Sequence, residues 1–93
     1  MEDATNSEKA DKKPLSDSEA VEHVIEILLS DTARLKARSE DEAAFFAIKA
    51  SSAMGYSEPM TAEQRAMNSM LAKLKMSYAC CEKAWKLYHY LRS

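Results

Sequence analysis

The sequence is poor in the residues that make turns. Its 93 residues include one glycine, Gly55, and two prolines, Pro14 and Pro59. A β-sheet domain of this length needs turn residues about every 8–12 positions. Their absence excludes a β-rich fold and predicts an all-α one. The length allows at most one small domain.

The sequence also lacks the patterns that take a chain into or across a membrane. No run approaches the ~18 consecutive apolar residues of a membrane span, and no basic segment leads into an apolar one as in a signal peptide. The two cysteines, Cys80 and Cys81, are adjacent within a predicted helix. Their side chains would diverge by ~100°, so a disulfide between them would be strained. We therefore expect reduced thiols and a cytoplasmic location.

Motifs for catalysis and metal binding are missing as well. The sequence has no glycine-rich phosphate loop, no H-E-x-x-H pair and no nucleophile elbow. His23 and His89 stand without an acidic or cysteine partner at ligand spacing, and the adjacent cysteines lack the C-x-x-C spacing. The acidic run at residues 40–42 is explained by the start of a helix, where negative charge is favourable. The sequence therefore predicts a non-enzyme without a metal or a cofactor.

A helix over about 61–91 dominates the pattern. Apolar or aromatic residues recur there in steps of four and three, the spacing of a coiled-coil seam, which places them on one stripe of a helix. These residues are Met67, Leu71, Leu74, Tyr78, Cys81, Trp85 and Tyr88. No glycine or proline interrupts the segment, so the pattern predicts one continuous helix ~45 Å long. Thr61 with Gln64 forms a capping box at its start.

The chain before this helix divides into a tail and the beginning of the domain. Residues 1–14 are charged and nearly without apolar side chains, so we expect them to be disordered. Residues 15–93 form the single helical domain. Its first helix is predicted over about 16–38, because Ser16 with Glu19 forms a capping box.

A second helix is predicted over about 40–54. Ser39 with Glu42 reads as another capping box, although an uninterrupted helix through Ser39 remains an alternative. Gly55 follows as the residue that ends a helix in the left-handed conformation. Because the connection to the helix at 61–91 is short, the two helices should form an antiparallel hairpin, with the first helix as the third member of a small bundle.

Charge is distributed unevenly. Residues 1–60 carry 13 acidic and 7 basic side chains, and residues 61–93 carry 2 acidic and 6 basic ones. We interpret this as a basic helix that lies against acidic neighbours within the chain. The alternative is a basic amphipathic helix that binds nucleic acid, calmodulin or an anionic membrane surface. Nucleic acid is disfavoured, because the whole chain is acidic and the aromatic residues lie on the apolar stripe.

The aromatic residues near position 90 are the feature of the sequence that most suggests a binding surface. Residues there widen the apolar surface beyond what one neighbouring helix covers, and two adjacent phenylalanines near position 45 cannot both face the seam. Trp and Tyr are the residues that most often anchor protein interfaces. The candidate partner-binding residues are Trp85, Tyr88, Tyr90, Leu91, Leu87, Phe45 and Phe46. Whether the terminal aromatic residues belong to the core or to an interface stays open.

These features predict a small non-catalytic protein-interaction module, such as an adaptor, a chaperone-like protein, an inhibitor or a complex subunit. It would bind a protein partner through an apolar helical face, and a homo-oligomer could use the same face. The layout of residues 15–93 is an acidic-capped helix, a polar turn with proline, and a Met/Leu-Ala-Tyr helix that closes on Trp-Lys-Leu-Tyr-His-Tyr. It resembles the small type III secretion co-chaperones, α-hairpins that hold needle subunits in the cytosol. The resemblance implies a chaperone role and assigns no role to any residue.

Overall fold

Four helices form the fold in a computed structural model that describes residues 14–30, 37–57 and 59–93. They are α2 (Asp17–Leu29), α3 (Glu40–Ala53), α4 (Ala62–Lys73) and α5 (Tyr78–Arg92). The predicted all-α class is confirmed. The predicted tail lies, apart from Pro14, outside the described residues. None of the described helices is long and apolar enough to span a membrane.

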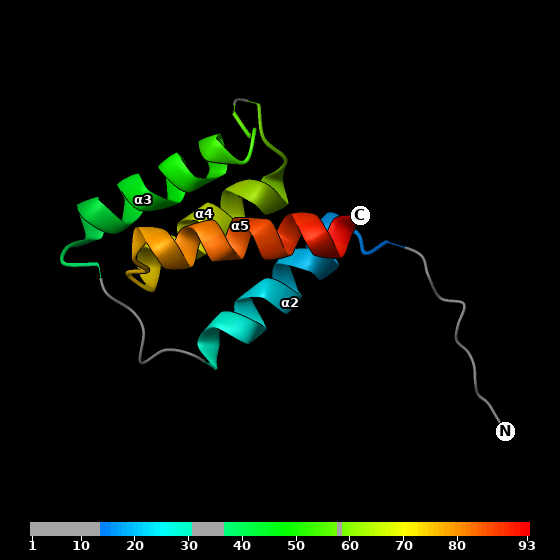
Figure 1. The fold of residues 1–93 in the computed structure, drawn as a ribbon, viewed down its shortest axis with the longest axis horizontal. Helices are drawn as coiled ribbons and strands as arrows, with labels where there is room; N and C mark the ends of the chain where they lie inside the picture. Colours follow the sequence, from blue (N-terminus) through cyan, green and yellow to red (C-terminus); the bar gives the residue numbers. More distant parts are fainter. Residues whose placement is uncertain (1–13, 31–36, 58) are drawn as a thin grey trace, which may run out of the picture.

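The four helices surround a common core, and α2 and α3 alternate around it with α4 and α5. Consecutive helices run in opposite directions, and α2 and α3 lie on opposite sides of the fold (Figure 1). Both α2 and α3 pack against α4 and against α5. The predicted antiparallel hairpin is present as α3 and α4. α5 therefore has two neighbouring helices, α2 and α3, and faces α4 across the core.

Two predicted capping boxes begin helices α2 and α4. The Ser16 hydroxyl accepts a hydrogen bond from the Glu19 N–H (3.2 Å), and the Glu19 carboxylate accepts one from the Ser16 N–H (2.9 Å). Thr61 and Gln64 exchange the same two bonds, both at 3.1 Å. Each pair satisfies two backbone donors that a helix start otherwise leaves without a partner.

The start of α3 follows the prediction only in part. The Ser39 hydroxyl caps the helix by accepting from the Glu42 N–H (3.1 Å), so the chain does break at Ser39. The Glu42 carboxylate instead accepts from the backbone N–H (2.9 Å) and the guanidinium (3.3 Å) of Arg38. These bonds, the backbone one first, hold the pKa of Glu42 below its usual value. The first helix, predicted to residue 38, ends at Leu29; residues 31–36 lie outside the described part.

Gly55 ends α3 as predicted. Its φ is +89°, and its N–H donates to the Ser52 carbonyl at 2.9 Å. The Tyr56 N–H donates to the Ser51 carbonyl, also at 2.9 Å. This pair of bonds is the Schellman motif, which reverses the chain toward α4.

The continuous helix predicted over 61–91 is wrong. α4 ends at Lys73, and α5 begins only at Tyr78. Between them Lys75 takes a left-handed φ of +56°, and the Ser77 hydroxyl accepts from the Cys80 N–H (3.3 Å) to cap α5. The chain therefore contains a helix end and a helix start where the sequence shows neither glycine nor proline.

The end of α4 repeats the motif found at Gly55. The Lys75 N–H donates to the Ala72 carbonyl (3.0 Å), and the Met76 N–H donates to the Leu71 carbonyl (3.1 Å). The Lys75 carbonyl also accepts from the Ala37 N–H (3.0 Å), which fixes the segment before α3 against this turn. The apolar residues before and after the break therefore lie on two antiparallel helices and face the same core.

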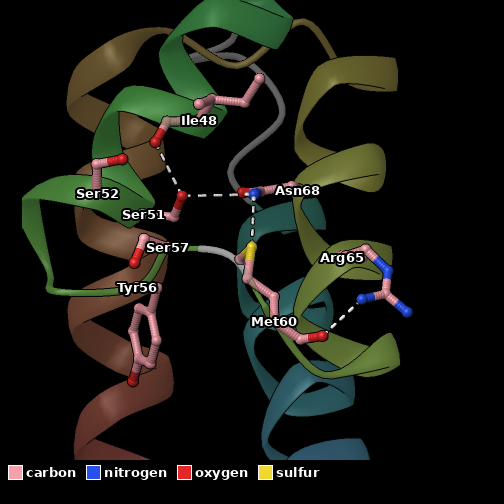
Figure 2. A pocket seen from close by; sticks show the side chains of 8 residues that line it. All are labelled: Ile48, Ser51, Ser52, Tyr56, Ser57, Met60, Arg65 and Asn68. Atoms are coloured by element: carbon pink, nitrogen blue, oxygen red, sulfur yellow. Dashed lines mark hydrogen bonds between the residues drawn. The ribbon is translucent and has the colours of Figure 1, made fainter.

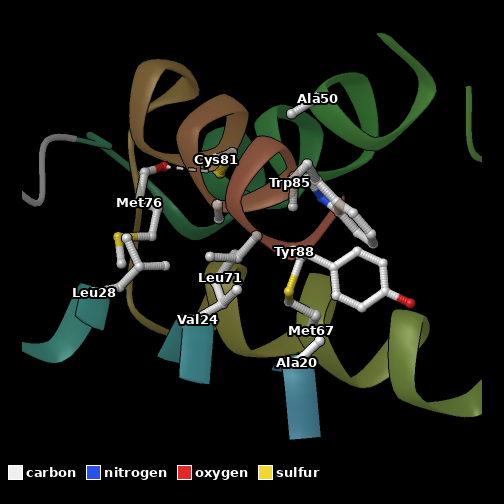
Figure 3. Close-up of a cluster of buried hydrophobic side chains, with 12 residues drawn as sticks. Ala20, Val24, Leu28, Ala50, Met67, Leu71, Met76, Cys81, Trp85 and Tyr88 are labelled. Carbon is white, nitrogen blue, oxygen red and sulfur yellow. Dashed lines mark hydrogen bonds between the residues drawn. The ribbon is translucent and has the colours of Figure 1, made fainter. Parts of the chain in front are cut away.

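The core lies between the four helices, and each of them contributes buried residues to it (Figure 3). Its largest fully buried side chains are Trp85, Tyr88, Met67, Leu71, Met76, Val24 and Cys81. α2 contributes a narrow strip of buried residues, Ala20, Val24 and Leu28. The buried side of α3 consists almost entirely of alanine, at positions 43, 47 and 50.

Candidate functional site

Trp85 and Tyr88, predicted as partner-binding residues, have no exposed surface. Their prediction as interface residues of the isolated chain is therefore wrong, and both belong to the core. The physical reason is the packing of α5, which is covered from two sides by α2 and α3. A single helix could not have covered both aromatic side chains, but two helices do.

Polar partners hold both rings in the core. The Trp85 indole N–H donates to the Asn68 side-chain oxygen (3.1 Å), and the ring centroid lies 4.9 Å from that of Tyr56. The Tyr88 hydroxyl accepts from the Gln64 side-chain amide (3.2 Å). Burial, more than any other cause, raises the pKa of Tyr88 to about 12. Both aromatic residues therefore serve the fold.

The end of α5 is closed by the start of α2. The Leu15 N–H donates to the Leu91 carbonyl (3.3 Å), and Arg92 forms an ion pair with Asp17. The predicted site residues Leu87 and Leu91 are both half-buried against the core. Tyr90 remains 76% exposed as a single aromatic side chain. The structure therefore does not bring the predicted residues of α5 together on one open surface.

The two phenylalanines of α3 have opposite environments. Phe46 is half-buried, with its ring 6.0 Å from that of Tyr78 in an edge-on arrangement. Phe45 is 57% exposed, and Lys49 places its ammonium 5.6 Å from the Phe45 ring centroid. Ile48, one turn further along the helix, is 59% exposed. Ile48 was not among the predicted site residues, and with Phe45 it forms an exposed apolar pair.

On α3 small residues face the core and large ones face solvent, which explains why this pair is exposed. Alanines at positions 43, 47 and 50 repeat in steps of four and three, and all three are buried. Small side chains allow α3 to lie close to α4 and α5, and this turns the larger apolar residues toward solvent. The alanine repeat is the sequence feature that could have identified Phe45 and Ile48 as the outer pair.

Phe45 and Ile48 belong to a face shared by two helices, which we call the α3–α4 face. It consists of exposed or partly exposed residues at helical spacing. On α3 these are Asp41, Phe45, Ile48 and Ser52, and on α4 they are Arg65, Ser69, Ala72 and Lys73. The face runs along the junction of the antiparallel helices.

A hollow of about 340 Å³ opens at one end of this face (Figure 2). Ile48 and Met60 line it together with polar side chains that bond to one another. The Ser51 hydroxyl donates to the Ile48 carbonyl (2.8 Å) and lies 3.5 Å from the Asn68 side-chain nitrogen. Arg65 donates to the Met60 carbonyl. Ser51, Asn68 and Arg65 are thus hydrogen-bonded within the chain, and most of the surface that lines the hollow is apolar.

A second hollow of about 500 Å³ lies at the other end of the α3–α4 face. It is lined by Glu40, Asp41 and Ala44 of α3, and by Ala72 and Lys73 of α4. The acidic residues begin α3, as the sequence predicts, and Lys73 stands across from them at the end of α4. This end of the face thus presents charges of both signs.

The remaining reactive side chains are dispersed. Within residues 14–30, 37–57 and 59–93, no group of three or more His, Cys, Asp and Glu is placed to hold a metal ion. His89 shares a hydrogen bond with the Tyr56 hydroxyl (2.9 Å), whereas His23 is exposed on α2. Both cysteines are thiols, and burial raises the pKa of Cys81 to about 12. The single basic amphipathic helix considered above is divided into two helices.

Comparisons with known proteins do not identify the chain. No protein-family model matches the sequence, no curated protein is significantly similar to it, and no solved structure matches its fold at a significant level.

Proposed function

We propose that the chain is a small non-catalytic helical module that binds a protein partner through the α3–α4 face. The observation that carries this proposal is the exposure of Phe45 and Ile48 side by side on α3, at 57% and 59%. Single exposed apolar residues are ordinary on protein surfaces, but adjacent ones beside a hollow are typical of interaction sites.

The surroundings of this pair support the proposal. The rest of α3 meets the requirements of a rigid platform, because Ser39 and Gly55 fix its two ends and alanines pack its inner side. A binding residue on a rigid helix loses little conformational entropy when a partner docks. Phe45 and Ile48 lie on the outer side, where a change of side chain leaves the core contacts intact.

The proposal is tested by crosslinking from single positions. A photoreactive phenylalanine analogue is placed at position 48 or, as the control, at position 90 of α5, which is even more exposed but lies off the face. After irradiation in cells that express the chain naturally, we expect a protein adduct from position 48 and none from position 90. Ile48→Glu should abolish co-purification of that protein and leave the circular dichroism spectrum unchanged. Adducts of equal yield from both positions would overturn the proposal.

A further inference from the structure

We propose that the occupant of the α3–α4 face is a second copy of this chain. The two copies form a two-fold symmetric dimer in which α3 of each lies on α4 of the other. This inference rests on the proposed function, because it uses the same face and names its partner. It follows from the self-complementary shape and charge of that face.

The first argument is shape. α3 presents two of its three large apolar side chains, Phe45 and Ile48, outward. Between Arg65 and Lys73, the same face of α4 carries only the small side chains Ser69 and Ala72. Large residues of one helix pack best on small residues of another, as ridges fit into grooves. One copy therefore offers both the projecting part and the receiving part of a helix–helix contact.

The second argument is charge. α3 and α4 are antiparallel, so the acidic start of α3 and the basic end of α4 lie at the same end of the face, around one hollow. A two-fold axis parallel to the helices, along the groove between them, places α3 on the partner's α4. The charged end of one copy then lies on the charged end of the other. Asp41 then faces the partner's Lys73, and the same contact occurs a second time by symmetry. Neither Asp41 nor Lys73 has an ion pair within the described residues.

The third argument concerns the hollow of about 340 Å³. By the same antiparallel relation, the level of Ile48 on α3 corresponds to the level of Asn68 on α4, since both line this hollow. The two-fold operation therefore brings the partner's Ile48 to the mouth of the hollow. An apolar side chain of the second copy then contacts the apolar lining of the hollow, and symmetry repeats this contact once.

The area of the α3–α4 face determines how tightly the two copies are expected to bind. The 14 residues of α3 span about 21 Å, and two adjacent helices are about 20 Å wide. A face of about 420 Å² on each copy is about half the ~800 Å² per partner of a standard interface and falls among weak, transient ones. We therefore expect a dimer with a dissociation constant in the micromolar range, in equilibrium with the monomer.

Sedimentation velocity of the purified full chain tests this inference at protein concentrations from about 1 µM to about 1 mM, a range that covers weak specific complexes. We expect the weight-average mass to rise from that of one chain to that of two. Ile48→Glu should raise the dissociation constant at least ~10-fold, because it brings a charge to the centre of the interface. Tyr90→Glu, a matched change at an exposed position off the face, should leave it unchanged.

A charge exchange distinguishes self-association through this face from association through any other surface. Asp41→Lys and Lys73→Asp should each weaken the dimer, because each places like charges opposite one another twice. An equimolar mixture of the two variants should associate again, since every contact across that pair then joins opposite charges. Only pairing between two copies predicts this recovery. Circular dichroism of each variant checks that the fold is retained.

The sedimentation and charge-exchange experiments test the homodimer and not the proposed function. A single-chain mass at every concentration, or a mixture no better associated than either variant, overturns the homodimer. The crosslinking result from position 48 would still decide the proposed function, because an adduct with a different protein supports the face as an interaction site without a second copy.

Discussion

Ser77→Ala tests the break between α4 and α5, the feature on which the position of every later side chain depends. The Ser77 hydroxyl accepts from the Cys80 N–H at 3.3 Å, a fairly long bond. Loss of an N-cap costs about 0.5–2 kcal/mol, and the length of this bond places the expected loss near 1 kcal/mol. For a domain of this size, that corresponds to a decrease in melting temperature of roughly 4–8 °C.

Lys75→Gly tests the same break with the opposite sign. A left-handed conformation costs a non-glycine residue about 1–2 kcal/mol, and glycine removes that cost. The greater freedom of glycine in the unfolded chain offsets roughly 0.5–1 kcal/mol of this gain. We therefore expect a net stabilisation of about 0.5 kcal/mol. The Lys75 carbonyl keeps its bond to Ala37, because the backbone acceptor is unchanged.

Urea denaturation followed by circular dichroism measures both variants, at a protein concentration of a few μM. His23→Ala in α2 is the control, because His23 is exposed and alanine in a helix interior stabilises by up to about 0.5 kcal/mol. If residues 74–77 were instead part of a continuous helix, both signs would be reversed. Ser77→Ala would then stabilise the fold, and Lys75→Gly would destabilise it by about 1 kcal/mol. That pair of signs would refute the reasoning.

Three further predictions concern the core. Trp85→Ala should destabilise the fold by about 3–5 kcal/mol in urea denaturation, since it removes a fully buried indole; near-native stability would contradict its assignment to the core. With a thiol-specific chromogenic disulfide at neutral pH, Cys80 should react in the native state and Cys81 only on unfolding, and Cys80→Ala should remove the fast phase. The folded pKa of Tyr88 exceeds its unfolded value, so its contribution to stability should persist below pH ~10 and disappear as the pH rises toward 12. Tyr88→Phe should reduce this alkaline loss; an unchanged pH profile would show that another group causes it.

Much of the fold could be predicted because capping is a local interaction. Ser16, Ser39 and Thr61 begin their helices where the sequence places them, and Gly55 ends α3. The break at Lys75 could not be predicted in the same way. Lysine rarely takes a positive φ, and the apolar spacing continues across the turn as if the helix did not stop.

The site was harder to predict, because exposure depends on how many helices surround a residue. Trp85 and Tyr88 lie on a stripe that looks too wide for one neighbouring helix, and the tertiary fold supplies two. On α3 the usual rule of large residues inside is reversed by its alanines. The adjacent phenylalanines showed that one of them must face outward, but nothing in the apolar spacing showed that Ile48 does so too.

The position of α2 has a consequence for synthesis on the ribosome. α2 packs on α4 and α5 and not chiefly on α3, its neighbour in sequence. About 50 residues separate the end of α2 from the start of α5. At roughly 5–20 residues per second, this is a delay of roughly 2–10 s. During that time the apolar strip of α2 is uncovered, which makes it the part of the nascent chain most in need of protection.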